Sequence, residues 1–408
     1  MENPKIRFKG FTKDWEQRKL GDVCSRVQGN DGRMKLPTLT ISAGNGWMRQ
    51  EDRFSGNIAG NEQKNYTLLH TGELSYNHGN SKLAKYGAVF SLRNYEEALV
   101  PRVYHSFRVE EGCADYIEYY FATKLPDREL RKLISSGARM DGLLNIGYDE
   151  FMGIKMMFPS IKEQNEIATY FRSLDHLITL HQRKCEQTKK LKKYMLQKMF
   201  PQNGAKVPEI RFDGFTYDWE QRKVTDLGEI YIGLVTTMTE HYTDKGHLLI
   251  RNSDIKDGYF EFGENPIYLD EEFSEQNKLR MHQLGDVITV HTGDIGTSAV
   301  IGENEVNSIG FATIVTRPNQ EILDSNYFAT YLNTDTHKQW AVSMATGDGR
   351  SNYNLKDYTK LVVPIPEIEE QKKIAACIVN LNSLITLHQR KCDELKKMKK
   401  YMLQNMFI

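Results

Sequence analysis

The residues whose types and spacing could do chemistry most directly are two histidine–cysteine pairs. His181 and Cys185 are four positions apart, and His388 and Cys392 repeat that spacing. Residues four apart lie on one face of a helix, and two histidines with two cysteines form a known ligand set for zinc. The alternative is packing, in which the cysteine fills a small apolar space beside a satisfied histidine. We expect packing, and therefore no metal in this chain.

A second set of useful side chains lies in two long polar segments, residues 24–150 and 228–357. Arg can read guanine and Asn can read adenine in the DNA major groove, each through paired hydrogen bonds. The candidate DNA-binding residues of the first segment are Arg33, Lys35, Ser42, Asn45, Arg49, Asn77, His78, Asn80, Lys82 and Arg139. Those of the second segment are Arg251, Asn252, Ser253, His291, Thr292, Thr297 and Arg350. Each of them is also explained, taken singly, as an ordinary solvated loop residue.

Two glycine-containing stretches lie late in these segments, SSGARMDGLLN (135–145) and ATGDGRSNYN (345–354). Each joins an arginine to an asparagine, and glycine lets a backbone approach a ligand closely. We expect the two stretches to occupy equivalent places, either at a DNA surface or as tight turns before the next strand.

Catalytic motifs are missing from the sequence. It contains no GxxxxGK[ST] phosphate loop, no HExxH and no GxSxG. An amino-methyltransferase should carry an Asn/Asp-Pro-Pro-aromatic tetrapeptide, but the nearest stretch, ENPIY (264–268), has Ile267 in place of the second proline. The sequence therefore predicts a recognition subunit and not an enzyme.

The elements that position these residues are duplicated. Residues 6–23 match residues 210–227 at 13 of 18 positions, and we name this pair the leading blocks. Residues 163–200 match residues 370–407 at 24 of 38 positions, and we name this pair the helix blocks. The segments between the blocks share little, so a constant frame carries two different surfaces.

Each helix block is predicted to be one long helix without Gly or Pro, about 57 Å long at a rise of about 1.5 Å per residue. Apolar residues recur mostly at steps of 4 and 3, which is typical of a heptad seam. The predicted seam of the first block is Ile167, Phe171, Leu174, Ile178, His181, Cys185, Thr188, Leu191, Met195 and Met199. The predicted seam of the second block is Ile374, Ile378, Leu381, Ile385, His388, Cys392, Leu395, Met398, Met402 and Met406.

We expect the two helices to pair antiparallel, with the two variable domains at opposite ends of the rod. The basic residues of the first helix are either a solvated face or a surface for a partner subunit or a phosphate backbone. They are Arg183, Lys184, Lys189, Lys190, Lys192, Lys193 and Lys198.

The variable segments contain short strand-like runs broken by glycine, with a few helical patches. Two patches carry the tripeptide FAT, at 121–123 and 328–330, which predicts equivalent places for them. The expected fold is α+β, with two β-rich domains separated by an antiparallel two-helix coiled coil. The expected domains are 1–158 and 204–365, with helices at 159–203 and 366–408.

Composition points to a cytoplasmic protein. The N-terminal sequence lacks the apolar core of a secretory signal. The chain also has no run of eighteen apolar residues, so we expect no membrane span. Five scattered cysteines without a CxxC pair indicate a reducing compartment. Lys plus Arg equals Asp plus Glu, at 54 each, so any DNA contact depends on local patches.

The duplicated blocks resemble the specificity (S) subunit of type I restriction–modification systems. The leading blocks RFKGFTKDWEQRKLGDV and RFDGFTYDWEQRKVTDL carry the likeness, as do the helix blocks with their EQ-x-x-I start and the shared LITLHQRKC. The resemblance covers essentially the whole chain. It departs at Cys185 and Cys392, where a larger aliphatic residue is expected, and at Val224-Thr225-Asp226 in place of Leu-Gly-Asp.

The resemblance implies that each variable segment is a target recognition domain for one half of a bipartite double-stranded DNA site, and that the helices set the gap between halves. It implies two methylation (M) subunits and two motor–nuclease restriction (R) subunits as partners. S-adenosylmethionine, ATP and Mg would belong to those partners, with no cofactor in this chain. Two rival interpretations are a coiled-coil scaffold whose end domains bind proteins, and a stand-alone methyltransferase or nuclease.

Overall fold

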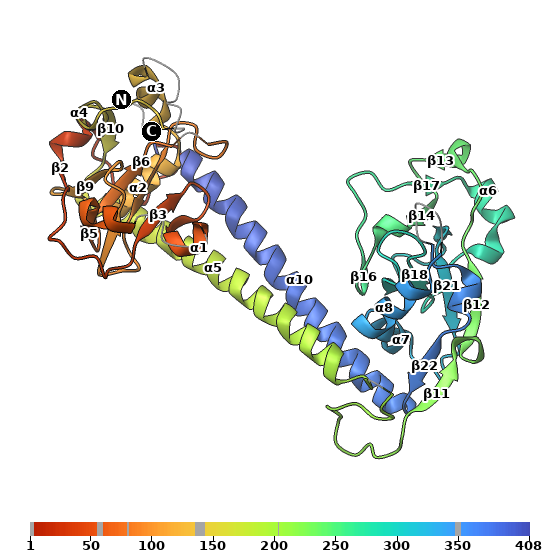
Figure 1. Ribbon diagram of the computed structural model, residues 1–408. Coiled ribbons are helices and arrows are strands. Elements are labelled where there is room, and N and C mark those ends of the chain that lie inside the picture. The colour runs from red at the N-terminus through yellow and green to blue at the C-terminus, as the bar shows by residue number, and fades with distance from the viewer. Residues whose placement is uncertain (1–3, 55–59, 80, 135–142, 203, 347–351) are drawn as a thin grey trace. The chain divides into compact units, whose positions relative to one another are not determined.

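The computed structural model (Figure 1) describes residues 4–54, 60–79, 81–134, 143–202, 204–346 and 352–408. Contacts divide the chain into two compact units. Unit 1 comprises residues 1–180 and 391–408, and unit 2 comprises residues 181–390. Both units mix helices with short strands, which confirms the predicted α+β class. None of the helices in the described ranges combines the length and apolar character that a membrane span needs.

Unit 1 is built on an antiparallel four-stranded sheet with the order β2-β9-β6-β7. Its strands are β2 (Cys24–Arg26), β6 (Leu74–Asn77), β7 (Ala88–Ser91) and β9 (His105–Val109). Three further strand pairs complete the unit: β1 (Glu16–Lys19) with β10 (Lys155–Phe158), β3 (Leu39–Ser42) with β4 (Gly46–Arg49), and β5 (Thr67–His70) with β8 (Glu97–Val100). The short helices are α1 (Gln50–Phe54), α2 (Ala114–Ala122), α3 (Asp127–Leu133) and α4 (Tyr148–Met152).

Unit 2 repeats this plan with the sheet order β12-β21-β18-β19. Its strands are β12 (Gly228–Ile232), β18 (Val287–Thr289), β19 (Ser298–Val300) and β21 (Ile314–Pro318). β11 (Glu220–Lys223) pairs with β22 (Val362–Ile365) as β1 pairs with β10. The corresponding helices are α7 (Ser325–Leu332), α8 (Asp335–Met344) and α9 (Leu355–Tyr358).

Unit 2 also has elements of its own. A second four-stranded sheet has the order β13-β17-β14-β20, in which β14 and β20 run parallel. Its strands are β13 (Tyr242–Thr243), β14 (His247–Arg251), β17 (Tyr268–Leu269) and β20 (Ile309–Phe311). The hairpin of β15 (Ile255–Lys256) and β16 (Tyr259–Phe260) and the helix α6 (Glu271–Gln276) complete the unit.

The leading blocks are held to the long helices by ion pairs. Arg7 donates from Nε and Nη2 to the two carboxylate oxygens of Glu163, at 2.7 and 2.8 Å. Arg211 does the same with Glu370, at 2.8 and 2.9 Å. Both carboxylates are buried, and a buried charge needs a hydrogen-bonded partner of opposite sign. These pairs explain why the arginine and the glutamate recur in both copies.

The two long helices are α5 (Ile161–Lys198) and α10 (Ile368–Asn405), of 38 residues each. In unit 1 the start of α5 packs against the end of α10, with Leu174 and Leu395 in one apolar cluster. In unit 2 the end of α5 packs against the start of α10, where the Sγ of Cys185 lies 3.9 Å from the carbonyl oxygen of Ile385. The helices therefore pair antiparallel in each unit, as the seam predicts.

The predicted seam is wrong at one position in each helix. Leu191 and Met398 are 46% and 48% exposed, whereas Lys192 is only 9% exposed. Lys192 follows Thr188 by four positions and precedes Met195 by three, so it keeps the alternation of steps that Leu191 would break. Lys192 is therefore a seam residue and not part of a solvated basic face.

In unit 2, His181 and Cys185 of α5 face α10. The Nδ1 atoms of His181 and His388 are 3.1 Å apart, and Cys185 and Cys392 are buried. Among the described residues, no group of three or more His, Cys, Asp or Glu side chains is placed to hold a metal ion.

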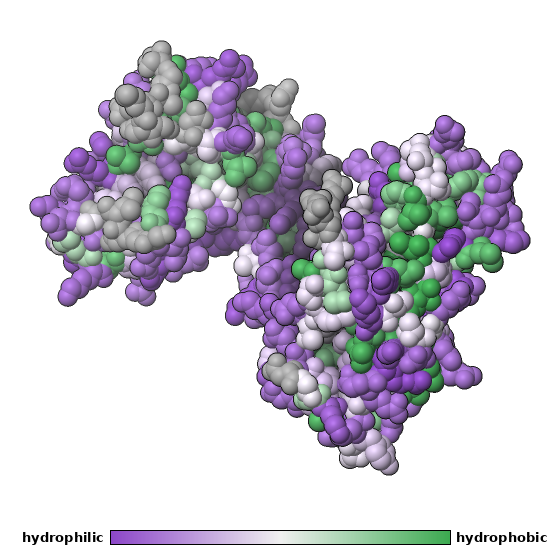
Figure 2. Space-filling model, turned by 45° about the vertical axis from the view of Figure 1, so that its right-hand side comes forward, coloured by the Kyte–Doolittle hydropathy of each residue, from purple (hydrophilic) through white to green (hydrophobic). Residues whose placement is uncertain are grey.

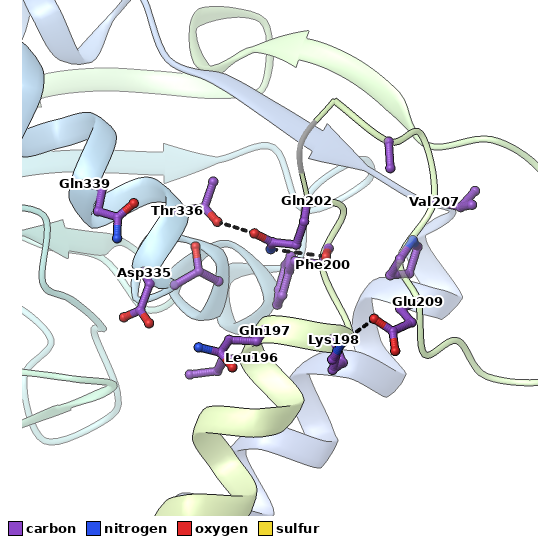
Figure 3. Close-up of a pocket in the computed structure, with 13 residues that line it drawn as sticks. Leu196, Gln197, Lys198, Phe200, Gln202, Val207, Glu209, Asp335, Thr336 and Gln339 are labelled. Atoms are coloured by element: carbon purple, nitrogen blue, oxygen red, sulfur yellow. Dashed lines mark hydrogen bonds and ion pairs between the residues drawn. The ribbon is translucent and has the colours of Figure 1, made fainter.

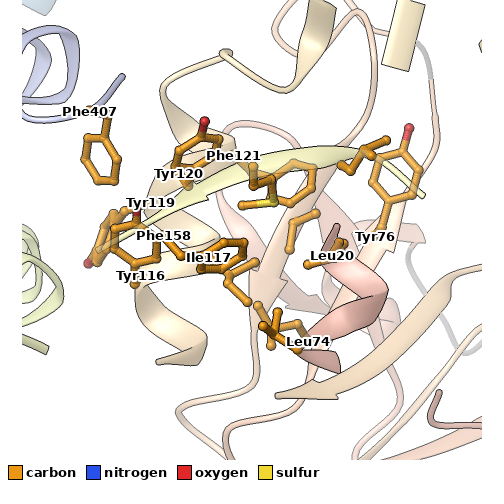
Figure 4. Packing of buried hydrophobic residues seen from close by; sticks show 14 of the residues in the cluster. Leu20, Leu74, Tyr76, Tyr116, Ile117, Tyr119, Tyr120, Phe121, Phe158 and Phe407 are labelled. Carbon is orange, nitrogen blue, oxygen red and sulfur yellow. The ribbon is translucent and has the colours of Figure 1, made fainter. Parts of the chain in front are cut away.

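The core of unit 1 is completed by the C-terminal residues. Phe407 packs against Tyr116 and Tyr120, with ring centroids 5.6 and 5.8 Å apart (Figure 4). It also packs against Trp15, at 6.4 Å. The amide of Ile6 donates to the carbonyl oxygen of Asn405 at 2.9 Å. In unit 2 the corresponding aromatic is Phe200, which packs against Trp219 and Tyr327.

The FAT tripeptides do not occupy equivalent places, although their helices do. The hydroxyl of Tyr116 donates to the carbonyl oxygen of Met157, and that of Tyr327 donates to Pro364. Met157 and Pro364 hold the same place in the β1–β10 and β11–β22 pairs. Tyr116 in α2 thus corresponds to Tyr327 in α7, and the FAT of α7 lies one helical turn earlier than that of α2.

Candidate nucleic-acid interface

Four of the candidates in unit 1 lie at one edge of the domain, where the β3–β4 turn meets the loop after β6. Asn77 ends β6 and donates from Nδ2 to the carbonyl oxygen of Ile41, at 3.2 Å. A Cβ at Gly44, in the β3–β4 turn, would lie 3.2 Å from the Leu83 side chain. Ser42 ends β3, Asn45 lies in the turn that follows, and Lys82 precedes Leu83. Asn45 and Lys82 are exposed, and Asn45 makes only a long contact from Nδ2 to the sulfur of Met48, at 3.9 Å.

His78 is a buried residue of this edge. It is 7% exposed, and its ring packs edge-on against Tyr76 and His105. Its carbonyl oxygen accepts a hydrogen bond from the amide of Leu144 at 2.9 Å, and Gly79 pairs with Leu143. The prediction that the His78 side chain reads a base has no support in this burial. Its backbone instead holds the late stretch of the segment against the loop.

Arg33, Lys35 and Arg49 lie apart from that edge. Arg33 donates from Nη1 and Nη2 to both carboxylate oxygens of Glu97, at 2.7 and 2.9 Å, and from Nε to Asp31. The hydrogen bond from Arg33 lowers the pKa of Glu97, so this carboxylate stays charged. Lys35 and Arg49 line one open hollow of about 450 Å³. Lys35 is exposed and could meet a phosphate backbone, whereas Arg49 donates from Nη1 to Glu51 at 2.7 Å and would first have to leave this partner.

In unit 2, Arg251 and Ser253 are tied to a buried carboxylate. Arg251 donates from Nε and Nη2 to Asp254, at 3.1 and 2.9 Å, and the Ser253 hydroxyl donates to the same side chain. Asn252 accepts from the amide of His291 at 2.8 Å and donates to the carbonyl oxygen of Ala312. These three residues therefore hold the loops of unit 2 together.

His291 and Thr292 form the counterpart of the edge in unit 1. The amide of Tyr353 donates to the carbonyl oxygen of His291 at 2.9 Å, as Leu144 does to His78. The Thr292 hydroxyl donates to Oδ1 of Asn352, at 2.7 Å, and Thr292 also pairs with Asn352 through the backbone. Burial lowers the pKa of His291, so its ring is neutral near pH 7 and can donate or accept. The described ends of the two late stretches, at Leu144 and Tyr353, therefore make equivalent backbone hydrogen bonds.

Thr297 is a correction to the candidate set. Its side chain is completely buried, and its hydroxyl donates to Asp294 at 2.6 Å. A residue without exposed atoms cannot touch a base in this conformation. Three other candidates, Asn80, Arg139 and Arg350, lie outside the described residues.

Sequence reasoning missed Asn352 as a member of the edge in unit 2. It joins Thr292 and Thr346, whose backbone also pairs with it. The available signal was its place two residues after Arg350, in a stretch already singled out for its glycines.

A pocket of about 650 Å³ lies beside the end of α5 in unit 2 (Figure 3). Its polar groups bond to one another: Thr336 donates to Oε1 of Gln202 at 2.9 Å, and Lys198 pairs with Glu209. Such mutual pairing is typical of a structural junction.

The visible surface of unit 2 also has hydrophobic residues gathered on one face (Figure 2).

Comparison with known proteins identifies the family. The sequence model of the type I restriction modification DNA specificity domain matches residues 12–190 and 217–397. The type I restriction enzyme MjaVIII specificity subunit of Methanocaldococcus jannaschii is 22% identical over 298 residues, which is 70% of this chain and 68% of that protein.

Solved structures share the fold. The type I restriction–modification S subunit from M. genitalium covers 100% of this chain and 99% of its own, with a TM-score of 0.62 and 13% identity. A chain from a study of complex assembly and conformational transition of the type I R-M system covers 98% and 99%, with a TM-score of 0.50 and 15% identity. The chain therefore belongs to the family of type I restriction–modification DNA specificity subunits and carries the family's domain twice.

Proposed function

We propose that this chain reads the two halves of a bipartite double-stranded DNA site, one half with each variable segment. The target recognition domains would be residues 1–158 and 204–365, with helices 159–203 and 366–408 as the spacer. The observation that carries the proposal is the repeated frame. Arg7–Glu163 and Arg211–Glu370 hold the same scaffold in both units, while the loops mounted on it differ.

In the first domain, Asn45 and Lys82 are the strongest candidates for direct DNA contact, with Ser42 and Asn77 beside them. An asparagine amide can pair with adenine in the major groove, and a lysine ammonium neutralises a phosphate. Lys35 and Arg49 would contact the backbone from their hollow. Arg33 would reach DNA only by leaving Glu97, so we assign it to holding the loop.

In the second domain, the proposed contact surface centres on His291, Thr292 and Asn352, supported by Asn252. Arg251 and Ser253 would shape the surface through Asp254. Arg139 and Arg350, which lie outside the described residues, remain candidates because each joins a glycine-containing stretch to an asparagine in the sequence.

The helix pair is proposed to set the gap between the half-sites. A helix of 38 residues is about 57 Å long at a rise of about 1.5 Å per residue. That length is about one and a half turns of duplex DNA, whose turn is roughly 34–36 Å. The facing of His181 and His388, the same residue of the two copies, supports a two-fold relation that would match the two strands of DNA.

Methylation subunits are the proposed partners of an apolar stripe on the two helices. We define the stripe by its exposed residues, which are Leu177, Leu191, Tyr194, Leu384, Leu387, Met398 and Tyr401. Leu177, Leu191 and Tyr194 recur 207 positions later as Leu384, Met398 and Tyr401. Apolar side chains exposed at the same places in both copies favour two equivalent partners.

Two methylation subunits and two restriction subunits would form the complete complex in the cytoplasm, and S-adenosylmethionine, ATP and Mg would be bound by them. The decisive experiment replaces residues 24–150 with the corresponding segment of another family member and sequences the methylome. The proposal expects a change in one half of a split motif, with the other half and the gap unchanged. A motif that does not depend on the swap would support a protein-binding scaffold instead.

A further inference from the structure

Two equivalent lysines of the helix pair, the buried Lys192 and the partly buried Lys399, form ion pairs with partners from different parts of the fold. Lys192 and Lys399 are equivalent, 207 positions apart, and both side chains lie largely inside the pairing of the helices. A buried ammonium group is stable only beside a carboxylate or another strong acceptor. Each lysine must therefore find a partner, and the structure supplies two different solutions.

In unit 1 the partner belongs to the helix pair itself. Lys399 of α10 forms an ion pair with Asp175 of α5. The hydroxyl of Tyr119 in α2 donates to the other oxygen of the Asp175 carboxylate at 2.9 Å. The charge of Lys399 is thus balanced without any residue from the loops that precede α2.

In unit 2 both of these partners are replaced. The residue equivalent to Asp175 is Asn382, 207 positions later, which carries no charge. The residue equivalent to Tyr119 is Thr330, by the correspondence of Tyr116 with Tyr327. Lys192 instead pairs with Asp257, whose Oδ2 lies 3.0 Å from Nζ. Asp257 lies in the turn of the β15–β16 hairpin, which belongs to the variable segment.

The hairpin turn is seated closely on the helices. Gly258 has a φ of +86°, and a Cβ there would lie 2.9 Å from Nδ2 of Asn382. Its amide donates to the carbonyl oxygen of Ser298 in β19, at 3.0 Å. One gap between the turn and the helices is only about 20 Å³, while the hairpin and the two long helices also line an open pocket of about 900 Å³. The turn therefore joins the main sheet of unit 2 to both long helices.

We propose that Asp257 is a positioning residue, and that the β15–β16 hairpin locks the second target recognition domain onto the helix pair. This inference rests on the proposed function. A domain that could tilt on the helices would present its half-site surface at varying distances. The lock would therefore restrict the gap length that the complex accepts, and it would do so from the side of the second domain only.

The test compares Asp257→Asn with the double variant Asp257→Asn/Asn382→Asp in the full chain. The double variant returns a carboxylate to the helix, as at Asp175, but leaves the hairpin untied. Glu261→Gln is the matched control, since it removes the same charge from the strand end of the hairpin, where its partner is Lys256. Hydrogen exchange of residues 255–260 is measured without DNA, and methylation by the assembled complex is measured on sites with the native gap and with one base pair more or less.

For Asp257→Asn we expect faster exchange in the hairpin and about a two- to five-fold gain in the relative use of altered gaps, the range of a partly exposed ion pair. In the double variant the melting temperature should return to that of the wild type, while both of these changes persist. Unchanged exchange in Asp257→Asn, or full restoration of exchange and gap choice in the double variant, would overturn the lock. A wild-type complex that recognises no bipartite site would contradict the proposed function, and the exchange measurement would still decide on the hairpin.

Discussion

Glu370 at the start of α10 accepts two hydrogen bonds from Arg211, in the same two-pronged arrangement that joins Glu163 to Arg7. Both glutamates are followed by a glutamine that bonds back to the proline carbonyl before the helix, Gln164 to Pro159 and Gln371 to Pro366. The ion pair therefore fixes the start of each long helix to a leading block, and the glutamine bond fixes the path of the chain into the helix. This shared joint lets the intervening loops vary without moving the frame.

The joint should be costly to break. Glu370→Gln leaves the Arg211 guanidinium without its counter-charge, and removal of one partner from a buried pair costs about 3 kcal/mol. We expect a loss of unfolding free energy of that size in urea titrations. Glu275→Gln is the control, because its partner Lys278 is 65% exposed, and it should change stability by less than about 0.5 kcal/mol. An equal loss of unfolding free energy in the two variants would argue against a stabilising role of the ion pair between Arg211 and Glu370.

Stability should also respond to pH through buried histidines of unit 2. Burial lowers the pKa of His337 to about 4 and that of His282 to about 3. The unfolded chain binds these protons below a pKa of about 6.5, so stability falls as the pH drops from 7 to 5, by about 2 kcal/mol for each histidine. In His337→Gln the loss over this range should be smaller by about 2 kcal/mol. An identical pH dependence in the variant and the wild type would show that His337 is not the source.

The exposed side chains of Lys82 and Asn45, at the edge of the first domain, should affect DNA binding in different ways. Lys82→Ala should weaken binding to all sequences and reduce the slope of log affinity against log salt by about 1. Asn45→Ala should relax the choice at one base position by about 1–3 kcal/mol. Titrations of the assembled complex at several salt concentrations separate the two. Lys132→Ala, an exposed lysine of α3 paired with Glu129, is the control and should leave both quantities unchanged.

The apolar stripe should bind the methylation subunits. Leu387 is 59% exposed, so Leu387→Glu should leave the melting temperature unchanged while it reduces co-purification with the methylation subunit at least about ten-fold, since a charge would be buried without a partner. Gln182→Glu introduces the same charge at another exposed position of the helix pair. If both variants assemble normally, the stripe does not face that partner.

The sequence alone predicted the duplicated frame, the two long helices, their antiparallel pairing and the equivalence of the two late stretches at their described ends. These features depend on identity and periodicity, which are local properties of the chain. The burial of Thr297 and His78 and the one-turn offset of the FAT motifs could not be predicted, because they depend on how the chain folds around these residues. Thr297 bonds to Asp294, His78 packs against His105, and Tyr116 bonds to Met157. The alternation of steps places Lys192 in the seam, but its partner Asp257 is 65 positions away in the sequence.

Part of the candidate site could not be predicted because some of its polar side chains form ion pairs with one another. Arg33 and Arg251 are of the residue type that reads bases, but each guanidinium group forms an ion pair, Arg33 with Glu97 and Arg251 with Asp254. Nothing in the spacing of these residues distinguishes an arginine that binds a neighbour from one that is free. Closure of unit 1 by Phe407, almost 300 residues after Tyr116, is equally invisible to periodicity.

The central claim is that each variable segment reads its own half-site on a common frame. A chimera tests it within one chain: residues 24–150 are replaced by a second copy of residues 228–357. The transplanted Asp257 would then meet Lys399 beside Asp175, so Asp175→Asn is included to avoid two carboxylates for one lysine. The same chimera with Asp175 retained should melt at a lower temperature.

Methylome sequencing of cells that carry this chimera with its methylation partner is the most direct measurement. We expect the asymmetric motif of the wild type to become symmetric, with two inverted copies of the half-site read by the second domain and the same gap. A motif that keeps both wild-type halves, or that changes in the half assigned to the untouched second domain, would contradict the account.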